Sequence, residues 1–345
     1  MISTQVRPDQ NVAARPEETN SMKAIVQDKY GSADVLKLED IDKPAAGDDD
    51  VLIRVHAAGV DRGVWHLMTG LPYLMRVMGF GFRAPSVRVR GRELAGRVEA
   101  TGKNIKQFKP GDEVFGTADG TFAEYVTAQE DKLALKPSNL TFEQAAAVPI
   151  SGATALQGLR GAGQVMPGQK VLVIGAGGGV GTFAVQIAKA FGAEVTGVCS
   201  TKKVDLVRSI GADHVIDYTR EDFTRSGQRY DLILDTAGLR SLTTLRRALA
   251  PKGTLVIVGG EGGGRWTGGF GRQALRAPVV SLFVGQTLRP LIAKESRDYL
   301  VVLKELIEAG KVTPVIDRTF PLSDAAQAIR YMSEGRATGK VVITT

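Results

Sequence analysis

Short apolar runs and helical periodicity alternate through the second half of the chain. Compact runs rich in Val, Ile and Leu indicate parallel strands buried on both faces, and apolar residues three and four positions apart indicate helices. The predicted strands are 171–174, 194–199, 214–217, 231–235, 254–258 and 279–284, and the predicted helices are 181–191, 202–210, 241–249 and 296–309. This alternation predicts a doubly wound parallel sheet in an α/β domain.

The first part of the chain carries strand patterns without clear helical periodicity. The predicted strands are 22–27, 35–40, 51–60, 94–100, 113–115, 124–127 and 132–136, which together predict a small β barrel. A helix begins at Thr141, where Gln144 completes a capping box, and a second helical piece covers 151–159. At the C-terminus, strands at 315–320 and 340–343 flank a helix at 323–333, and we expect the last strand to return to the barrel.

A glycine-rich turn joins the strand 171–174 to the helix 181–191. Its positions are Gly175, Ala176, Gly177, Gly178, Gly179, Val180 and Gly181. Glycine lets the backbone approach a pyrophosphate closely, and the free N–H groups and positive dipole of a helix N-terminus attract its charge. The alternative is glycine used for packing alone. A P-loop is excluded because Gly181 is followed by Thr182 rather than by the Lys of that motif.

The end of the next strand favours NADPH over NADH. An NAD site usually has an acidic residue about twenty residues after the glycine turn, where it binds the ribose hydroxyls. This chain instead has Ser200, Thr201, Lys202 and Lys203. Hydroxyls and cations bind a 2′-phosphate and leave NAD without its usual ribose partner. We therefore predict NADPH as the cofactor.

Composition places the chain among globular proteins of a reducing compartment. It has 345 residues, of which 43% are hydrophobic and 23% charged, and no apolar run is long enough for a transmembrane helix. The net charge of +7 is spread along the chain, which argues against nucleic-acid binding. A single cysteine, Cys199, rules out disulfides within the chain, and we expect a cytoplasmic protein. Residues 1–21 are polar and predict a disordered tail, or a true start at Met22.

Several motifs occur in an order that identifies a family. They are VHAAGVD at 55–61, KPGDEVF at 109–115, GTFAEY at 120–125, AAAVP at 145–149, GADHVIDY at 211–218, GTLVIVG at 253–259 and GKVV at 339–342. From Met22 to Thr345 the chain resembles the zinc-independent quinone oxidoreductase, or zeta-crystallin-like, branch of the medium-chain dehydrogenase/reductase superfamily. The resemblance implies a GroES-like β barrel domain from 22–150 and 310–345, and a Rossmann NADP-binding domain at 151–309. The active cleft is expected between the two.

The resemblance also assigns cofactor-binding residues. Lys203 and Tyr218 match positions that bind the 2′-phosphate in NADPH-dependent members, although Tyr218 is also interpretable as a surface aromatic at a strand end. Thr154 matches a contact to the nicotinamide end, and Gly259 and Val284 match positions where backbone lines the cofactor groove. The family further implies a homodimer through the sheet edge near 281–284.

The chain departs from the zinc-dependent members of this superfamily at the metal positions. Those enzymes have Cys where this chain has Asp61 and His where it has Arg92, and they use four cysteines for a structural zinc. Because this chain lacks these ligands, we expect no metal and no metal-polarised alcohol oxidation. Quinone reductase relatives usually have Asn in place of Asp61.

Without a metal, the acceptor must take hydride through its own conjugation, assisted by hydrogen-bond donors at the developing oxyanion. We therefore expect an NADPH:quinone oxidoreductase-like enzyme acting on hydrophobic quinones or α,β-unsaturated carbonyls. Asp61 is the first catalytic candidate, with helix capping as the alternative. His66 and Tyr73 are candidate proton donors, and Arg92 binds either an anionic group or a neighbouring carboxylate. The competing hypotheses are an enoyl-thioester reductase and an NADPH-binding structural or regulatory protein with vestigial activity.

Two unusual segments flank the predicted cleft. Residues 67–82 are apolar and rich in Met, and three interpretations stay open: a cover that selects bulky substrates, a membrane contact, or a core helix. Residues 259–278 are rich in glycine and predict a mobile flap, or an excursion without a role.

Overall fold

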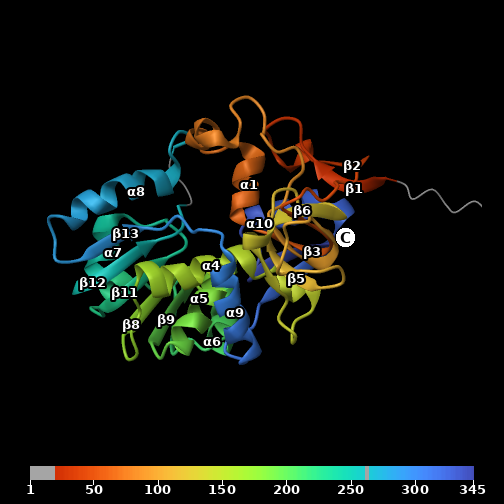
Figure 1. Cartoon of the computed structure of the whole chain (residues 1–345). Helices are drawn as coiled ribbons and strands as arrows, with labels where there is room; N and C mark the ends of the chain where they lie inside the picture. The colour runs from red at the N-terminus through yellow and green to blue at the C-terminus, as the bar shows by residue number, and fades with distance from the viewer. Residues whose placement is uncertain (1–19, 261–263) are drawn as a thin grey trace, which may run out of the picture.

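The computed structural model describes residues 20–260 and 264–345, and two sheets dominate it (Figure 1). The predicted tail at 1–21 lies almost wholly outside the described residues, and the first strand begins at Ser21. The domain boundaries drawn at 150 and 310 stay predictions, but the two sheets and the return of the C-terminal strand confirm the predicted α/β class.

The second sheet has six parallel strands in the order β10-β9-β8-β11-β12-β13. Its strands are β8 (Lys170–Ile174), β9 (Glu194–Cys199), β10 (His214–Asp217), β11 (Tyr230–Asp235), β12 (Leu249–Ile257) and β13 (Thr287–Pro290). Val171 and Val173 of β8 pack on one face with helices α4 (Pro149–Leu156), α5 (Gly179–Ala190), α6 (Val204–Ser209) and α9 (Arg297–Glu308). Leu172 and Ile174 face the other side, with α7 (Leu242–Ala248) and α8 (Gly268–Ser281). The Rossmann-type sheet is thus covered on both faces, as its continuous apolar runs predict.

The first sheet forms the GroES-like barrel, in the order β14-β15-β3-β4-β5-β7 with β6 paired to β3. Its strands are β3 (Asp50–Val60), β4 (Glu93–Thr101), β5 (Glu113–Thr117), β6 (Tyr125–Gln129), β7 (Leu133–Leu135), β14 (Ile316–Pro321) and β15 (Lys340–Thr344). A separate pair, β1 (Ser21–Val26) and β2 (Lys37–Asp42), flanks it, and the remaining helices are α1 (Arg62–Thr69), α2 (Tyr73–Met75), α3 (Phe142–Ala146) and α10 (Ala325–Ser333). Antiparallel pairing of β15 with β3 confirms that the C-terminal strand returns to the barrel.

The prediction between β12 and β13 is wrong in two places. Residues 279–284, predicted as a strand, form the end of α8 and the turn after it, and the edge strand is the shorter β13 at Thr287–Pro290. The predicted glycine-rich flap at 259–278 becomes helical from Gly268, while residues 261–263 lie outside the described residues. The strand was predicted because the residues at 279–284 are mostly apolar, as in a buried strand. Leu282 and Phe283 are instead about four-fifths exposed.

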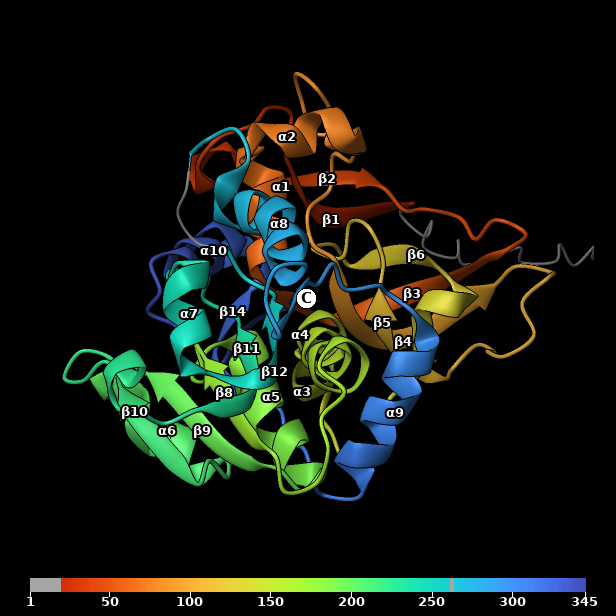
Figure 2. The same ribbon diagram turned by 90° about the vertical axis from the view of Figure 1, so that its left-hand side faces the viewer.

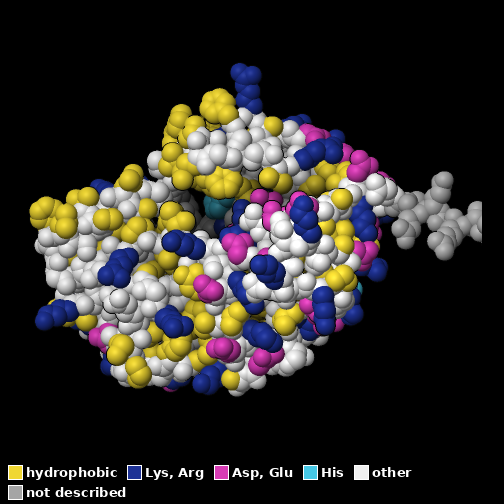
Figure 3. Space-filling view, in the orientation of Figure 1, with side chains coloured by type: hydrophobic (Ala, Val, Ile, Leu, Met, Phe, Trp, Pro, Cys, Tyr) yellow, Lys and Arg dark blue, Asp and Glu magenta, His cyan; other side chains and the backbone are white. Residues whose placement is uncertain are grey.

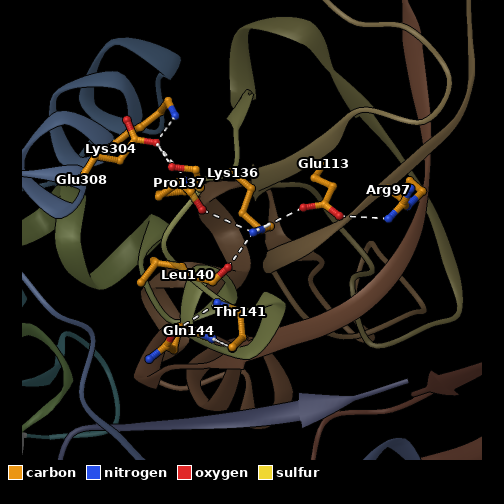
Figure 4. A network of polar contacts seen from close by, with 10 residues as sticks. Arg97, Glu113, Lys136, Pro137, Leu140, Thr141, Gln144, Lys304 and Glu308 are labelled. Carbon is orange, nitrogen blue, oxygen red and sulfur yellow. Dashed lines mark hydrogen bonds and ion pairs between the residues drawn. The ribbon is translucent and has the colours of Figure 1, made fainter.

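The barrel and the Rossmann-type sheet share one continuous core and a polar network. Ala57, Ala95 and Phe115 of the barrel pack in the same cluster as α3, α4 and α5. Figure 4 shows Lys136, whose Nζ donates to the carbonyl oxygen of Leu140 at 2.6 Å and lies 3.3 Å from Glu113. In the same network Glu308 of α9 accepts from Lys304 at 2.6 Å and from the Ser138 backbone N–H at 2.9 Å. These contacts fix α9 of one unit against the loop that leaves β7 of the other.

Figure 1 and Figure 2 show a segment that crosses from the barrel side to the segment before α8. Residues 70–86, which we call the arm, follow α1 and reach across the top of the molecule to the segment before α8.

The capping box at Thr141 and Gln144 is present as predicted. Among the described residues, no helix is long and apolar enough to cross a membrane.

Candidate functional site

The glycine turn lies at the carboxyl ends of the parallel strands, where open α/β sheets bind ligands. Gly175 follows β8 with φ +83°, a conformation that glycine adopts without strain. A Cβ added to Gly181 would lie 2.1 Å from the carbonyl oxygen of Gly175, so the strand and α5 can approach this closely only with glycine there. Gly178 is the N-cap of α5, and the first N–H groups of that helix, at Gly179 and Val180, have no intrahelical acceptor.

The carboxyl end of β9 brings Ser200 and Lys203 beside this turn, as predicted. Ser200 precedes the short helix Thr201–Lys203, and the alkyl chain of Lys203 lies against Gly177, 2.7 Å from where a Cβ would stand. The Lys203 ammonium donates to the carbonyl oxygen of Ala337, and burial lowers its pKa. An anion at the turn would offer this ammonium group a further, charged hydrogen-bond acceptor.

The carboxyl ends of β11 and β12 complete the groove. Gly259 packs so tightly on the Thr236 carbonyl that a Cβ would lie 1.9 Å from its oxygen. Asp235, which the sequence analysis did not select, accepts from the N–H groups of Gly238 at 2.9 Å and Ala237 at 3.2 Å. Burial raises the pKa of Asp235 to about 6. The two hydrogen bonds to Asp235 hold the turn after β11 in its conformation.

On the opposite side of the turn, α4 presents Thr154 and Ser151, both buried. The Oγ of Ser151 lies 3.3 Å from the place where a Cβ of Gly179 would stand. Ser151, one helical turn before Thr154, was not selected from the sequence because a lone serine on an apolar helix carries no signal. The structure therefore brings Ser151 beside the glycine turn, and Thr154 follows it one helical turn later in α4.

A fully buried ion pair joins the barrel to the same turn. Glu93 of β4 and Lys340 of β15 form a short hydrogen bond, and their side chains are 0% and 2% exposed. Glu93 also accepts from the backbone N–H of Ile150, at the start of α4, at 2.8 Å. The Lys340 side chain packs beside Gly179, 3.1 Å from where a Cβ of that residue would stand. Burial raises the pKa of Glu93 to about 7 while Lys340 opposes that rise. Sequence reasoning missed this pair.

The catalytic candidates occupy different positions around α1. Asp61 is its N-cap: Oδ1 accepts from the Val64 N–H at 3.1 Å, so the capping alternative is confirmed. Its other oxygen, Oδ2, is buried and has no hydrogen-bond partner among the described residues. His66, near the other end of α1, is 2.7 Å from the Leu71 carbonyl oxygen through Nδ1. Arg92 binds a neighbouring carboxylate, with 2.8 Å to Glu295 of the Rossmann side and 3.5 Å to Asp119.

The arm places Tyr73 against the segment that precedes α8. The backbone N–H groups of Tyr73 and Leu74 donate to the carbonyl oxygens of Arg265 and Trp266 at 2.7 and 3.0 Å, and the Tyr73 and Trp266 rings are 5.6 Å apart. A groove of about 560 Å³ lies between these aromatic rings and Phe82. Figure 3 shows a hollow beneath the arm, with hydrophobic side chains along its rim. The arm is a surface bridge rather than a core helix, since Val77 and Met78 are about two-thirds exposed.

One of the assigned cofactor residues, Val284, lies apart from the glycine turn, whereas Tyr218 stands next to the strand end that precedes Ser200. Val284 lines a surface depression with Arg229, Arg246 and Pro251, at the opposite, amino-terminal edge of the sheet. Tyr218 stands at the end of β10 with half its side chain exposed, and its backbone N–H donates to Cys199. The structure therefore does not bring Val284 to the glycine turn, and the homodimer near this edge stays a prediction.

The residues present fit a dinucleotide and do not fit a zinc ion. The N–H groups of Gly179 and Val180 at the start of α5 have no intrahelical acceptor, which suits a pyrophosphate at the glycine turn. At the metal position of the zinc-dependent relatives, Asp61 caps a helix and Arg92 is bound to Glu295. Among residues 20–260 and 264–345, no group of three or more His, Cys, Asp and Glu is arranged to hold a metal.

Comparison with known proteins places the chain in a family. The profile described as "Alcohol dehydrogenase GroES-like domain" matches residues 47–138, and that described as "Zinc-binding dehydrogenase" matches residues 210–343. The 2-methylene-furan-3-one reductase of Solanum lycopersicum is 35% identical over 94% of this chain and 79% of its own length. The NADPH-dependent alkenal/one oxidoreductase of Arabidopsis thaliana is 35% identical over 96% and 82%.

A solved structure gives the same result for the fold. The quinone oxidoreductase from Coxiella burnetii superposes with a TM-score of 0.82 at 28% identity, over 94% of this chain and 99% of the other. Sequence and fold agree over nearly the whole chain. The chain therefore belongs to the medium-chain dehydrogenase/reductase family, in its quinone oxidoreductase and alkenal reductase branch.

Proposed function

We propose that the protein is an NADPH-dependent reductase that transfers hydride to quinones or α,β-unsaturated carbonyl compounds without a metal. The observation that carries the proposal is the glycine turn at the carboxyl edge of the sheet, with Lys203 beside it and an apolar arm over the adjoining cleft. Hydride is the chemistry that a bound NADPH supplies. The names of the tomato and Arabidopsis relatives, both reductases of conjugated carbonyls, support the acceptor class.

The chain's own residues orient the acceptor. Tyr73, Trp266 and Phe82 give the groove an aromatic lining, which suits a flat conjugated acceptor. The unpartnered Oδ2 of Asp61 is a polar atom available to hold or relay a proton. His66 and Tyr73 remain the candidate proton donors for the reduced product.

Lys203 is expected to set the preference for NADPH over NADH. Replacing it with methionine keeps the alkyl chain against Gly177 and removes the cation. Because a charge-assisted hydrogen bond contributes about 1.5–3 kcal/mol, the affinity for NADPH should fall by roughly ten- to a hundredfold while that for NADH stays near its original value. Fluorescence titration with both nucleotides measures this. Lys202→Met, at the neighbouring exposed lysine, is the control, and an equal loss for both nucleotides contradicts the assignment.

Trp266 is expected to contribute to the binding of large acceptors. The Trp266→Ala change removes one wall of the groove, so the KM for bulky hydrophobic quinones should rise about tenfold, because the exposed indole loses the apolar area that it would bury against a large acceptor, while small acceptors such as but-3-en-2-one are little affected. Steady-state kinetics with a size series of acceptors tests this. Phe283→Ala removes an equally exposed aromatic ring outside the groove and serves as the control. Identical size dependence in both variants argues against a selective arm.

A panel of acceptors tests the proposal as a whole. NADPH consumption by chelator-treated protein is measured with quinones, enones and enoyl thioesters, and turnover of the first two classes supports the proposal. Preferential turnover of enoyl thioesters points instead to the enoyl-thioester reductase. Binding of NADPH without turnover of any acceptor points to a binding protein with vestigial activity.

A further inference from the structure

Arg90 is a buried cation whose guanidinium has no partner among residues 20–260 and 264–345. Its side chain belongs to a residue that is 4% exposed, and its Nε is buried with no hydrogen-bond partner. No hydrogen bond or ion pair reaches its guanidinium from any residue that the structure describes; only its backbone is paired, with Ile25 and Phe122. A buried guanidinium normally has a hydrogen-bonded anionic partner, because leaving the charge unpaired costs several kcal/mol. The missing partner therefore needs an explanation.

The guanidinium lies beside a partly open cavity of about 170 Å³. The walls of this cavity come from α1, from the arm, from the segment before β4 and from the loop after β5, and they include Val64, Leu67, Phe80, Arg90, Arg92 and Asp119. Apolar side chains, two arginines and one carboxylate thus share the lining. The cavity has the size and the mixed lining of a site for a small amphipathic molecule.

The other charges around the cavity are already compensated. Arg92 is bound by Glu295 at 2.8 Å and by Asp119 at 3.5 Å. Asp119 acts on Arg90 only at a distance, together with the Tyr30 hydroxyl, whereas burial dominates and lowers the Arg90 pKa. The Tyr30 hydroxyl itself donates to carbonyl oxygens of the arm, at 2.7 Å to Phe80 and 2.6 Å to Gly81. Among the described residues, Arg90 is therefore the cation of this lining whose guanidinium has no direct hydrogen-bonded or ion-paired partner.

The cavity adjoins the catalytic candidate Asp61. Val64 of its lining donates its backbone N–H to Asp61, and Arg92 of its lining interacts electrostatically with Asp61 and binds Glu295 on the Rossmann side. We propose that Arg90 binds a carboxylate group carried by the acceptor, so that the preferred substrates are small conjugated carbonyl compounds with a carboxylate at one end. The planar guanidinium fork matches two carboxylate oxygens. This specificity rests on the proposed reductase function, but binding to the cavity does not require turnover.

A non-reducible probe tests the cavity separately from the reaction. Calorimetric titration of the whole protein compares 4-oxopentanoate with its methyl ester, which has the same carbon chain without the charge. Wild type is expected to bind the acid at least about tenfold more tightly, as expected for a hydrogen-bonded charge pair. Arg90→Met should abolish this difference. Arg88→Met removes an arginine of the same segment that is ion-paired with Asp28 and Glu39 outside the cavity, and it should retain the difference.

Steady-state kinetics provide a second test. With NADPH, the ratio of kcat/KM for 4-oxopent-2-enoate to that for its methyl ester should fall about tenfold in Arg90→Met and not in Arg88→Met. Because the Arg90 charge has no partner, thermal unfolding of Arg90→Met should occur at or above the wild-type temperature, which shows that the variant is folded. Equal binding of acid and ester by wild type overturns the inference. Probe binding without reduction of any acceptor overturns the proposed function and leaves the carboxylate site standing.

Discussion

Replacing Lys340 with methionine is expected to lower the free energy of unfolding by about 3–5 kcal/mol, the range for breaking a buried ion pair. The change leaves Glu93, whose side chain is 0% exposed, without its cation. The remaining hydrogen bond from the Ile150 N–H, at 2.8 Å, cannot replace a full positive charge. Urea denaturation followed by circular dichroism measures the loss.

Two further variants separate the charge effect from lost packing. Glu93→Gln with Lys340→Met removes both charges and keeps similar volumes, so the double variant should recover most of the stability lost in the single one. Exposed Lys23, which pairs with Asp40 at 3.1 Å on the surface, supplies the control, and Lys23→Met should change stability by less than about 1 kcal/mol. If the double variant is as unstable as Lys340→Met, the buried charge is not the cause.

Alanine at two glycines of the cofactor turn is expected to have two different effects. A Cβ at Gly181 would lie 2.1 Å from the Gly175 carbonyl oxygen, so Gly181→Ala should disrupt the turn, lower stability and abolish measurable NADPH binding. A Cβ at Gly178 would meet only that same oxygen, at 3.3 Å, and the backbone there is extended with φ −99°. Gly178→Ala should therefore fold with near-normal stability.

Gly178→Ala is expected to lose NADPH affinity while it keeps its stability, whereas Gly181→Ala is expected to lose both. In Gly178→Ala the methyl group occupies space at the N-terminus of α5 where a pyrophosphate would approach, so NADPH affinity should fall by about tenfold or more despite normal folding. Thermal unfolding gives the stability and fluorescence titration the affinity. Normal NADPH binding by a folded Gly178→Ala protein would show that the nucleotide phosphates do not bind at this turn.

The sequence predicted those parts of the fold that depend on local patterns. The strands around the glycine turn are runs such as Val171–Ile174, whose burial on both faces follows from composition alone. Residues 279–284 look similar in sequence, yet they end a helix with Pro278 inside it. The true edge strand, Thr287–Pro290, contains Arg and Pro and is a strand because it pairs with β12. Such pairing is a tertiary effect that a local pattern does not contain.

The candidate site likewise contains residues that local sequence patterns predict and residues that depend on tertiary contacts. Ser200, Lys203 and the glycines follow directly from the strand-turn-helix order, and the structure brings them together. Glu93 and Lys340 are separated by 247 positions, and Arg92 and Glu295 by 203. A charged residue in a sequence is usually exposed, so nothing local distinguishes these from surface charges. The unpaired state of Arg90 is likewise visible only once its surroundings are known.

The most direct test of the reductase account follows the hydride itself. Chelator-treated protein is mixed with an enone and with NADPH that carries deuterium at the transferable position of the nicotinamide, and the product is analysed by mass spectrometry and NMR. The account predicts a saturated ketone with one deuterium at the former β carbon. Deuterium on the carbonyl carbon of an allylic alcohol, or no transfer to any conjugated acceptor, would contradict it.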